Sequence, residues 1–190
     1  ASVVMGGITS ASRETIRPIL HRFKTLYFYN TLYEGGVCDR NEITLGTTPA
    51  QTVEKLVPYT MNMWGKKVYT IAADYNYGQI TAAWVKRYVE QNGGEVVSTD
   101  FFPLDVTNFG PTISKIQGAK PDMVMHVLVG TGHLGFLNQW AAAGMKNKIP
   151  MASTTFGAAG ADIEIIKPEA ANGVITSYGY YPSIDTPENK

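Results

Sequence analysis

The sequence has almost no cysteine: Cys38 is the single thiol among 190 residues, so the chain can form no internal disulfide. Charge of either sign is not in excess, because 16 basic residues balance 16 acidic ones and the formal net charge is zero. A nucleic-acid partner would call for a basic stripe, and this balance gives no support for one. No apolar run approaches the roughly 20 residues that a membrane-spanning helix needs. These absences exclude a disulfide scaffold and give no support for a nucleic-acid binder or a membrane-spanning chain.

Signatures of metal, cofactor and catalytic sites are equally scarce. The three histidines, His21, His126 and His133, do not have the spacing of metal ligands, so no metal site is expected. Gly130-Thr131-Gly132 begins a dinucleotide-binding pattern but does not complete it, and no cofactor is expected. There is no G-x-S-x-G elbow, and Ser153, which follows an apolar run, has no histidine in an obvious partnering position. We therefore expect no catalytic residues and a protein that is not an enzyme.

What the sequence does contain is an alternation of short apolar runs with helical patterns. Such an alternation is typical of βαβ units and predicts an α/β fold with doubly wound parallel sheets. Strands are expected at residues 3–8, 26–29, 43–46, 67–73, 95–101, 123–129, 150–153 and 174–178. Helices are expected near residues 13–24, 50–64, 79–92, 109–118, 133–143 and 161–166. Pro18 lies in the middle of the first and argues against a regular helix there.

Polar and aromatic side chains follow several of the predicted strands. The apolar run that ends at Ala73 leads into Asp74, Tyr75, Asn76 and Tyr77. Ligands of open parallel sheets bind beyond the carboxyl ends of the strands, so these positions are candidates for a ligand site. Hydroxyls and phenols there suit gripping a small polar molecule rather than reacting with it. An alternative stays open, in which one tyrosine caps the sheet and the other is solvated.

A similar choice applies to the turn after the first predicted strand. Ser10 is a candidate for holding a neutral or zwitterionic group of a ligand, together with backbone N–H groups at the start of the next helix. In the alternative, Ser10 or Ser12 only caps that helix.

Two segments interrupt the alternation of predicted strands and helices: the long Gly-rich loop from Thr31 to Asn41 and the segment Met63 to Lys67. We expect three parts: residues 1–65 as a partial first lobe, 66–178 as a second lobe, and 179–190 as a segment leading back toward a hinge. The first part has too few strands for a good parallel sheet with both faces covered. The chain is therefore expected to be an internal piece of a longer polypeptide.

Together these segments resemble the type I periplasmic binding-protein superfamily, in particular its branched-chain amino acid and short-chain amide or urea receptors. The most specific pieces are Tyr33-Glu34-Gly35 and Asp74-Tyr75-Asn76-Tyr77. Other matching segments run from Gly7 to Arg13, Phe102 to Phe109, Ala119 to Asp122 and Val129 to Gly132. The resemblance covers nearly the whole chain, but only the middle of a family member.

The resemblance implies a two-lobed type I fold whose cleft closes on a ligand about a hinge. The residues that it implies for ligand binding lie at strand ends in both lobes: Thr9, Ser10, Tyr29, Asn30, Thr31, Tyr75, Tyr77, Gly130, Thr131 and Thr155.

The function implied by the resemblance is that of a substrate-binding protein of an ABC importer, periplasmic or tethered to the cell surface as a lipoprotein. Its partners would be a small-molecule ligand (an amide, urea or an amino acid) and a membrane permease. A short-chain amide or urea is expected in preference to a branched-chain amino acid. The reason is that no acid for an α-ammonium group is evident after Ser153, and burying an unpaired charge is costly. The alternative is a cytoplasmic amide-sensing regulatory protein of the same fold.

Overall fold

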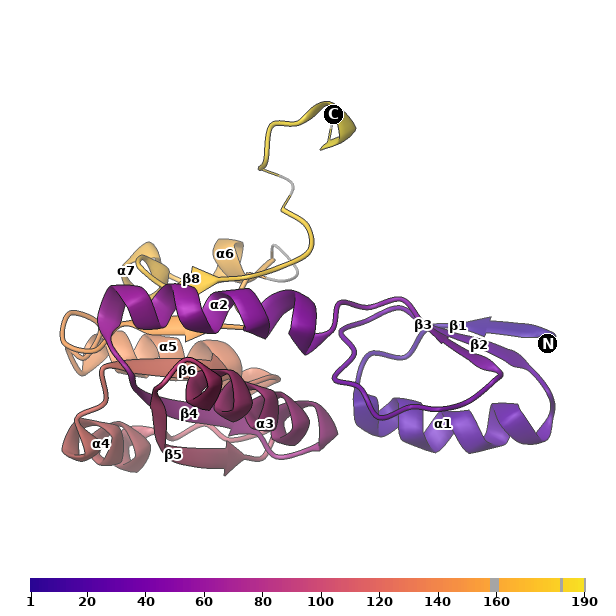
Figure 1. Ribbon diagram of the computed structural model, residues 1–190, viewed down its shortest axis with the longest axis horizontal. Helices are drawn as coiled ribbons and strands as arrows, with labels where there is room; N and C mark the ends of the chain where they lie inside the picture. Colours follow the sequence, from indigo (N-terminus) through magenta and orange to yellow (C-terminus); the bar gives the residue numbers. More distant parts are fainter. Residues whose placement is uncertain (158–160, 182, 190) are drawn as a thin grey trace.

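The computed structural model describes residues 1–157, 161–181 and 183–189 and divides them between two parallel β-sheets. The smaller sheet has the order β1-β2-β3 and carries one helix, α1 (Figure 1). Its elements are β1 (Val3–Met5), α1 (Ser10–Arg22), β2 (Leu26–Tyr29) and β3 (Glu42–Thr44). We call this part, residues 1–44, the first body.

The larger sheet has the order β5-β4-β6-β7-β8, and all of its described strand pairs are parallel. Its strands are β4 (Lys67–Ala73), β5 (Glu95–Phe102), β6 (Met123–Val127), β7 (Met151–Ser153) and β8 (Ile175–Thr176). The helices of this part are α2 (Pro49–Trp64), α3 (Asn76–Gln91), α4 (Gly110–Ala119), α5 (Thr131–Ala142), α6 (Ala161–Ile165) and α7 (Pro168–Ala171). We call residues 49–176 the second body. The predicted α/β class with doubly wound parallel sheets is confirmed.

The strand order of the second body reverses between β4 and β6. From β4 the chain passes through α3 to β5 at one edge, and α4 then returns it to β6 on the other side of β4. Such a reversal leaves a crevice beyond the carboxyl ends of the two central strands, where ligands of open α/β sheets bind. The segments that follow β4 and β6 are therefore the positions at which this sheet can hold a ligand.

Helices cover both faces of the larger sheet, and β4 shows how its side chains divide between them. Val68 and Ala72 point into a cluster with α2 and α3, whereas Tyr69 and Ile71 point into a cluster with α4 and α5. This alternation follows from the two-residue period of a strand. Because both faces are covered, β4 is apolar along nearly its whole length, as strands of parallel sheets generally are.

Helix α2 packs with the second body, although the predicted division at residue 65 assigns it to the first lobe. Val53, Leu56 and Val57 of α2 belong to the same buried cluster as Val68 and Ala72 of β4. Figure 1 likewise shows α2 lying along the larger sheet, away from β1 to β3. The packing of α2 thus favours a division between β3 and α2.

Several element ends differ from the predicted ones for local reasons. The first strand ends at Met5 because Gly6 and Gly7 take positive φ angles of 137° and 86°. Helix α1 begins at Ser10, capped by Thr9, and continues through Pro18. The short helix α7 and a 3₁₀ turn, η1 (Pro187–Asn189), were not predicted. Between β8 and η1 the described chain runs out from the larger sheet (Figure 1).

A close approach fixes the start of α3 against the end of β4, and it can be tested by filling the space. A Cβ on Gly78 would lie 2.0 Å from the carbonyl oxygen of Ala73. We expect Gly78→Ala to lower the free energy of unfolding by about 1–3 kcal/mol, the usual cost of overpacking. Chemical denaturation of the intact protein measures the change.

The matched control is Gly118→Ala in α4, because no atom lies within 4 Å of the added Cβ. Alanine is the better helix former, so this change should leave stability unaltered or raise it by up to about 1 kcal/mol. Equal losses in the two variants would contradict the close packing at Gly78.

Candidate functional site

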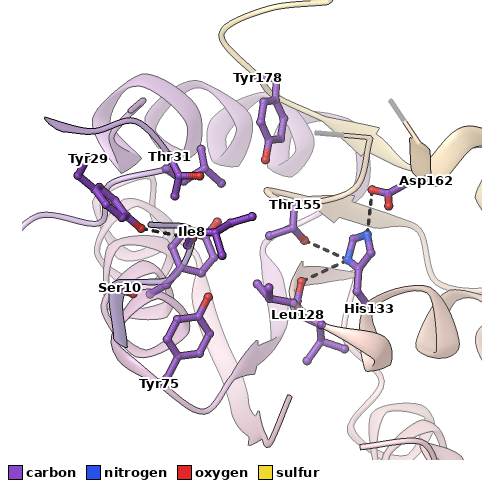
Figure 2. Close-up of a pocket in the computed structure, with 14 residues that line it drawn as sticks. Ile8, Ser10, Tyr29, Thr31, Tyr75, Leu128, His133, Thr155, Asp162 and Tyr178 are labelled. Atoms are coloured by element: carbon purple, nitrogen blue, oxygen red, sulfur yellow. Dashed lines mark hydrogen bonds and ion pairs between the residues drawn. The ribbon is translucent and has the colours of Figure 1, made fainter. Parts of the chain in front are cut away.

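A cavity of about 300 Å³ lies between the two bodies and is lined by side chains from both (Figure 2). Its walls include seven of the residues predicted to bind ligand: Ser10, Tyr29, Thr31, Tyr75, Tyr77, Gly130 and Thr155. We call this cavity the interbody pocket. Its volume is at the small end of the range for ligand sites, so it suits a small solute.

Ser10 presents an unused hydroxyl to the interbody pocket. It is the first residue of α1, the residue is only 1% exposed, and its Oγ has no hydrogen-bond partner within the described ranges. The neighbouring Thr9 has the capping role, because its Oγ1 accepts a hydrogen bond from the backbone N–H of Ser12 at 3.1 Å. The side chains of Thr9 and Ser12 thus cap α1, as the alternative held for Ser12, whereas a ligand role for Ser10 stays a prediction.

The tyrosine on the same wall is held by a buried ion pair. The Tyr29 hydroxyl donates to the carbonyl of Ile8 at 3.4 Å, and the Arg13 guanidinium lies 4.9 Å from the centre of the Tyr29 ring. Arg13 Nη2 donates to Glu34 Oε1 at 2.6 Å, and both side chains are almost fully buried. Burial opposes the charge on Arg13, but hydrogen bonds to Glu34 and Glu14 outweigh it and raise the pKa of Arg13. This permanent ion pair positions Tyr29 through the contact of Arg13 with its ring, and it links the loop that carries Glu34 to α1.

Tyr75 and Tyr77 form the wall that follows β4, with ring centres 6.2 Å apart. The hydroxyl oxygen of Tyr77 lies 3.4 Å from Thr154 Oγ1, and Figure 2 shows the Tyr75 hydroxyl directed toward the pocket. Burial raises the pKa of Tyr75 and raises that of Tyr77 to about 12. Both phenols are therefore neutral at physiological pH, and each can donate or accept a hydrogen bond.

The opposite wall, beyond β6 and β7, carries a histidine paired with an acid. His133 Nε2 lies 3.2 Å from Asp162 Oδ2, and His133 Nδ1 lies 3.2 Å from the carbonyl oxygen of Leu128 and 3.3 Å from Thr155 Oγ1 (Figure 2). Asp162 Oδ2 also accepts from the backbone N–H of Gly157 at 3.0 Å. Burial lowers the pKa of His133, and the Asp162 carboxylate opposes that shift.

Behind this wall, the second histidine contacts a serine. His126 Nδ1 lies 3.1 Å from Ser153 Oγ, so the expectation that Ser153 has no histidine partner is wrong. The Ser153 hydroxyl is fully buried and accepts hydrogen bonds from the backbone N–H groups of Thr155 and Phe156. It therefore shapes the turn after β7 and is not displayed as a nucleophile.

Three helices begin at the interbody pocket. Ser10 opens α1, Tyr77 lies in the first turn of α3, and Gly130 precedes α5. The N-terminus of a helix carries a partial positive charge and free N–H groups, so it favours a negatively charged or strongly accepting group. The lining of the pocket contains no lysine or arginine among the described residues, which leaves these helix ends as its main fixed source of positive potential.

Three predicted ligand residues do not line the pocket. Thr9 caps α1, Thr131 Oγ1 donates to the carbonyl of Leu104 at 3.2 Å, and Asn30 is exposed. Other lining residues were not predicted: Ile8, Leu32, Leu128, Val129, His133, Asp162 and Tyr178. The apolar members come shortly after strand ends. The rule that ligands bind beyond the carboxyl ends of parallel strands could therefore have found them. Asp162 and Tyr178 are brought in by the tertiary fold, without a local signal.

Asp162 corrects the premise on which an uncharged ligand was preferred. The sequence showed no acid near the turn after Ser153, whereas the structure places the Asp162 carboxylate in the pocket wall. Within the same described ranges there is no cluster of three or more candidate metal ligands, and no helix combines the length and apolar character needed to cross a membrane.

Comparisons with known proteins agree with this architecture. The family described as "Periplasmic binding protein domain" matches residues 1–190. The "Leu/Ile/Val-binding protein homolog 6" of Brucella melitensis is 28% identical over 145 residues, which are 75% of this chain and 37% of that protein. The chain thus spans well under half the length of this curated relative.

Two solved structures show the same fold. One is a solute-binding protein of an ABC transporter from R. palustris in complex with 4-hydroxybenzoate. Its TM-score is 0.83 at 23% sequence identity, and the match covers 100% of this chain and 52% of that protein's chain. A branched chain amino acid ABC transporter periplasmic ligand-binding protein from Burkholderia xenovorans LB400 has a TM-score of 0.79 at 16% identity, with 97% and 50% coverage.

These matches confirm the resemblance to type I periplasmic binding proteins that the sequence motifs indicated. The chain belongs to the periplasmic binding protein domain family.

Proposed function

We propose that this chain forms the ligand-binding cleft of a solute-binding protein that serves an ABC importer. The observation that carries the proposal is the interbody pocket. Ser10 of one body, whose buried hydroxyl has no partner among the described residues, lines it together with phenols of the other body. Hydroxyls of this kind bind by hydrogen bonding and can release the solute unchanged. A membrane permease would be the partner that receives it.

The pocket supports a solute with a compact apolar body and an oxygen-rich end. Ile8, Leu32, Leu128 and Val129 supply apolar surface, whereas the start of α1 supplies N–H groups and the Ser10 hydroxyl. Helix N-termini favour a carboxylate over a cationic group. The similar R. palustris protein in complex with 4-hydroxybenzoate and the similar branched chain amino acid ABC transporter protein are consistent with such a solute.

A short amide or urea, expected from the sequence, is a weaker proposal for this pocket. A urea molecule would leave much of the apolar lining uncovered, although its N–H groups could donate to the Asp162 carboxylate. A carboxylate-bearing solute satisfies the helix ends, and the apolar walls then enclose the rest of it. An amide still belongs in a panel of test solutes, because its carbonyl oxygen can also accept a hydrogen bond from the Ser10 hydroxyl.

A periplasmic location accords with this role and with the family, and attachment to the cell surface through a lipid remains a proposal made from the sequence resemblance. The importer hypothesis predicts that solute enters and leaves without chemical change. Mass spectrometry of solute released from the intact, natively purified protein tests this directly, because a covalent product or an altered molecule would argue for catalysis.

A panel of solutes distinguishes the ligand classes. Benzoate, leucine, acetamide and urea are each added to the intact protein, and the melting temperature is measured. A ligand present at 100 times its Kd adds about 2.7 kcal/mol to the free energy of unfolding. For a protein of this size that corresponds to a rise of roughly 5–10 °C. We expect this rise with benzoate or leucine and not with acetamide or urea; the reverse pattern would restore the amide.

Ser10 and Thr9 form a matched pair of substitutions for the site itself. Ser10→Ala removes a hydroxyl that has no hydrogen-bond partner among the described residues, so the melting temperature should hardly change. Affinity for the solute should fall by about 1–2 kcal/mol, the usual cost of a lost hydrogen bond to a buried group. That is roughly a 5- to 30-fold rise in Kd by calorimetry.

Thr9→Ala is the control, because Thr9 caps α1 and does not line the pocket. Loss of the cap should lower the free energy of unfolding by about 1 kcal/mol and leave Kd nearly unchanged. If Ser10→Ala lowers stability and spares affinity, Ser10 is part of the helix cap and not of the ligand site.

A further inference from the structure

His133 is placed between two groups that can only accept hydrogen bonds. Its Nδ1 faces the carbonyl oxygen of Leu128 at 3.2 Å, and its Nε2 faces the carboxylate of Asp162 at 3.2 Å. A carbonyl oxygen has no proton to give, and an ionised carboxylate has none either. Both contacts are therefore hydrogen bonds only if both ring nitrogens carry a proton.

Each neutral form of the ring leaves one of these contacts unfavourable. With the proton on Nε2, the ring donates to Asp162, but the Nδ1 lone pair faces the Leu128 oxygen. With the proton on Nδ1, the ring donates to Leu128, but the Nε2 lone pair faces the carboxylate. Thr155 Oγ1, 3.3 Å from Nδ1, can relieve only the first arrangement by donating its own proton. The geometry thus suits the imidazolium, whereas burial opposes it.

The other titratable groups around His133 do not replace this proton. His126 of β6 has its ring centre 5.0 Å away and is fully buried, and burial lowers its pKa so that it stays neutral. Tyr77 of α3 and Tyr178 after β8 line the same pocket, and burial raises the pKa of both phenols. Asp162 of α6 is the acid among the described lining residues. Protonated His133 would be the one formal cation in that lining.

We infer that a solute carboxylate enters the interbody pocket together with one proton, which His133 holds between Leu128 and Asp162. This inference rests on the proposed function and names the class of solute: a monoanion. An anionic oxygen in the pocket adds a second negative charge beside Asp162 and so favours the imidazolium. A zwitterionic amino acid brings its own ammonium group, which can pair with Asp162, and a neutral amide brings no charge. Neither of those solutes needs the proton.

Calorimetry with benzoate tests the coupling, because benzoate has a carboxylate and no second group that titrates near neutral pH. Titrations of the intact protein are repeated at one pH in buffers of different ionisation enthalpy. The slope of the observed binding enthalpy against the buffer ionisation enthalpy gives the number of protons taken up. We expect an uptake approaching one between the ligand-free and ligand-bound pKa values of His133. Because the bound state holds more protons, binding weakens as the pH increases, and Kd should rise about tenfold for each unit of increasing pH across that window.

His133→Gln is the informative variant, since glutamine can still donate and accept hydrogen bonds but cannot titrate. We expect it to abolish the proton uptake and to flatten the pH dependence of Kd. His21→Gln is the matched control, because His21 is an exposed residue of α1 near Asp39 and does not line the pocket. It should retain both properties of the unaltered protein.

Imidazole NMR shifts of His133 in the unaltered protein provide a second measurement that does not depend on the folding of a variant. They should change from the neutral to the doubly protonated form when benzoate is added. Benzoate binding without proton uptake, or without this change, would overturn the inference while leaving the proposed function intact. Binding of leucine or acetamide in place of benzoate would also overturn it. Failure of the proposed function would instead appear as a natively purified protein that carries and binds no solute.

Discussion

Every strand pair described in either sheet is parallel, and this constraint decides where binding groups can lie. Parallel strands need crossover connections, so their carboxyl ends collect at one edge of each sheet. In the second body, the reversal of strand order between β4 and β6 opens that edge. The starts of α1, α3 and α5 are brought to the pocket by the same rule, and each contributes the partial positive charge of a helix N-terminus.

The sequence predicted those residues of the pocket lining that follow directly from this constraint. Ser10, Tyr75 and Tyr77 were found because each comes directly after an apolar run, and the sheet then places them at the cleft. Asp162 was missed because α6 is short and its contact with His133 spans 29 residues of sequence. The attachment of α2 to the second body was missed for a similar reason: its apolar face is evident locally, but the surface that it covers is decided by tertiary packing.

A buried ion pair and a histidine–aspartate contact support the pocket, and they differ in chemistry. Arg13 and Glu34 lie beneath Tyr29 in the first body, and the guanidinium stays charged at any pH that the protein survives. His133 and Asp162 lie in the second body, and an imidazole changes its charge near neutrality. One pair therefore fixes geometry, whereas the other can respond to what occupies the pocket.

Under the proposed function, the neutral tyrosines of the pocket bear on how its choice of solute can diverge. A phenol can turn its proton toward an acceptor or away from a donor, so its contact with a solute does not commit the site to one functional group. Substitutions among the apolar residues Ile8, Leu32 and Leu128 could change the shape of the accepted solute while the polar contacts persist. The backbone would not have to move. If the pocket binds a solute, changes in its apolar lining alone could alter which solute is accepted, in small evolutionary steps.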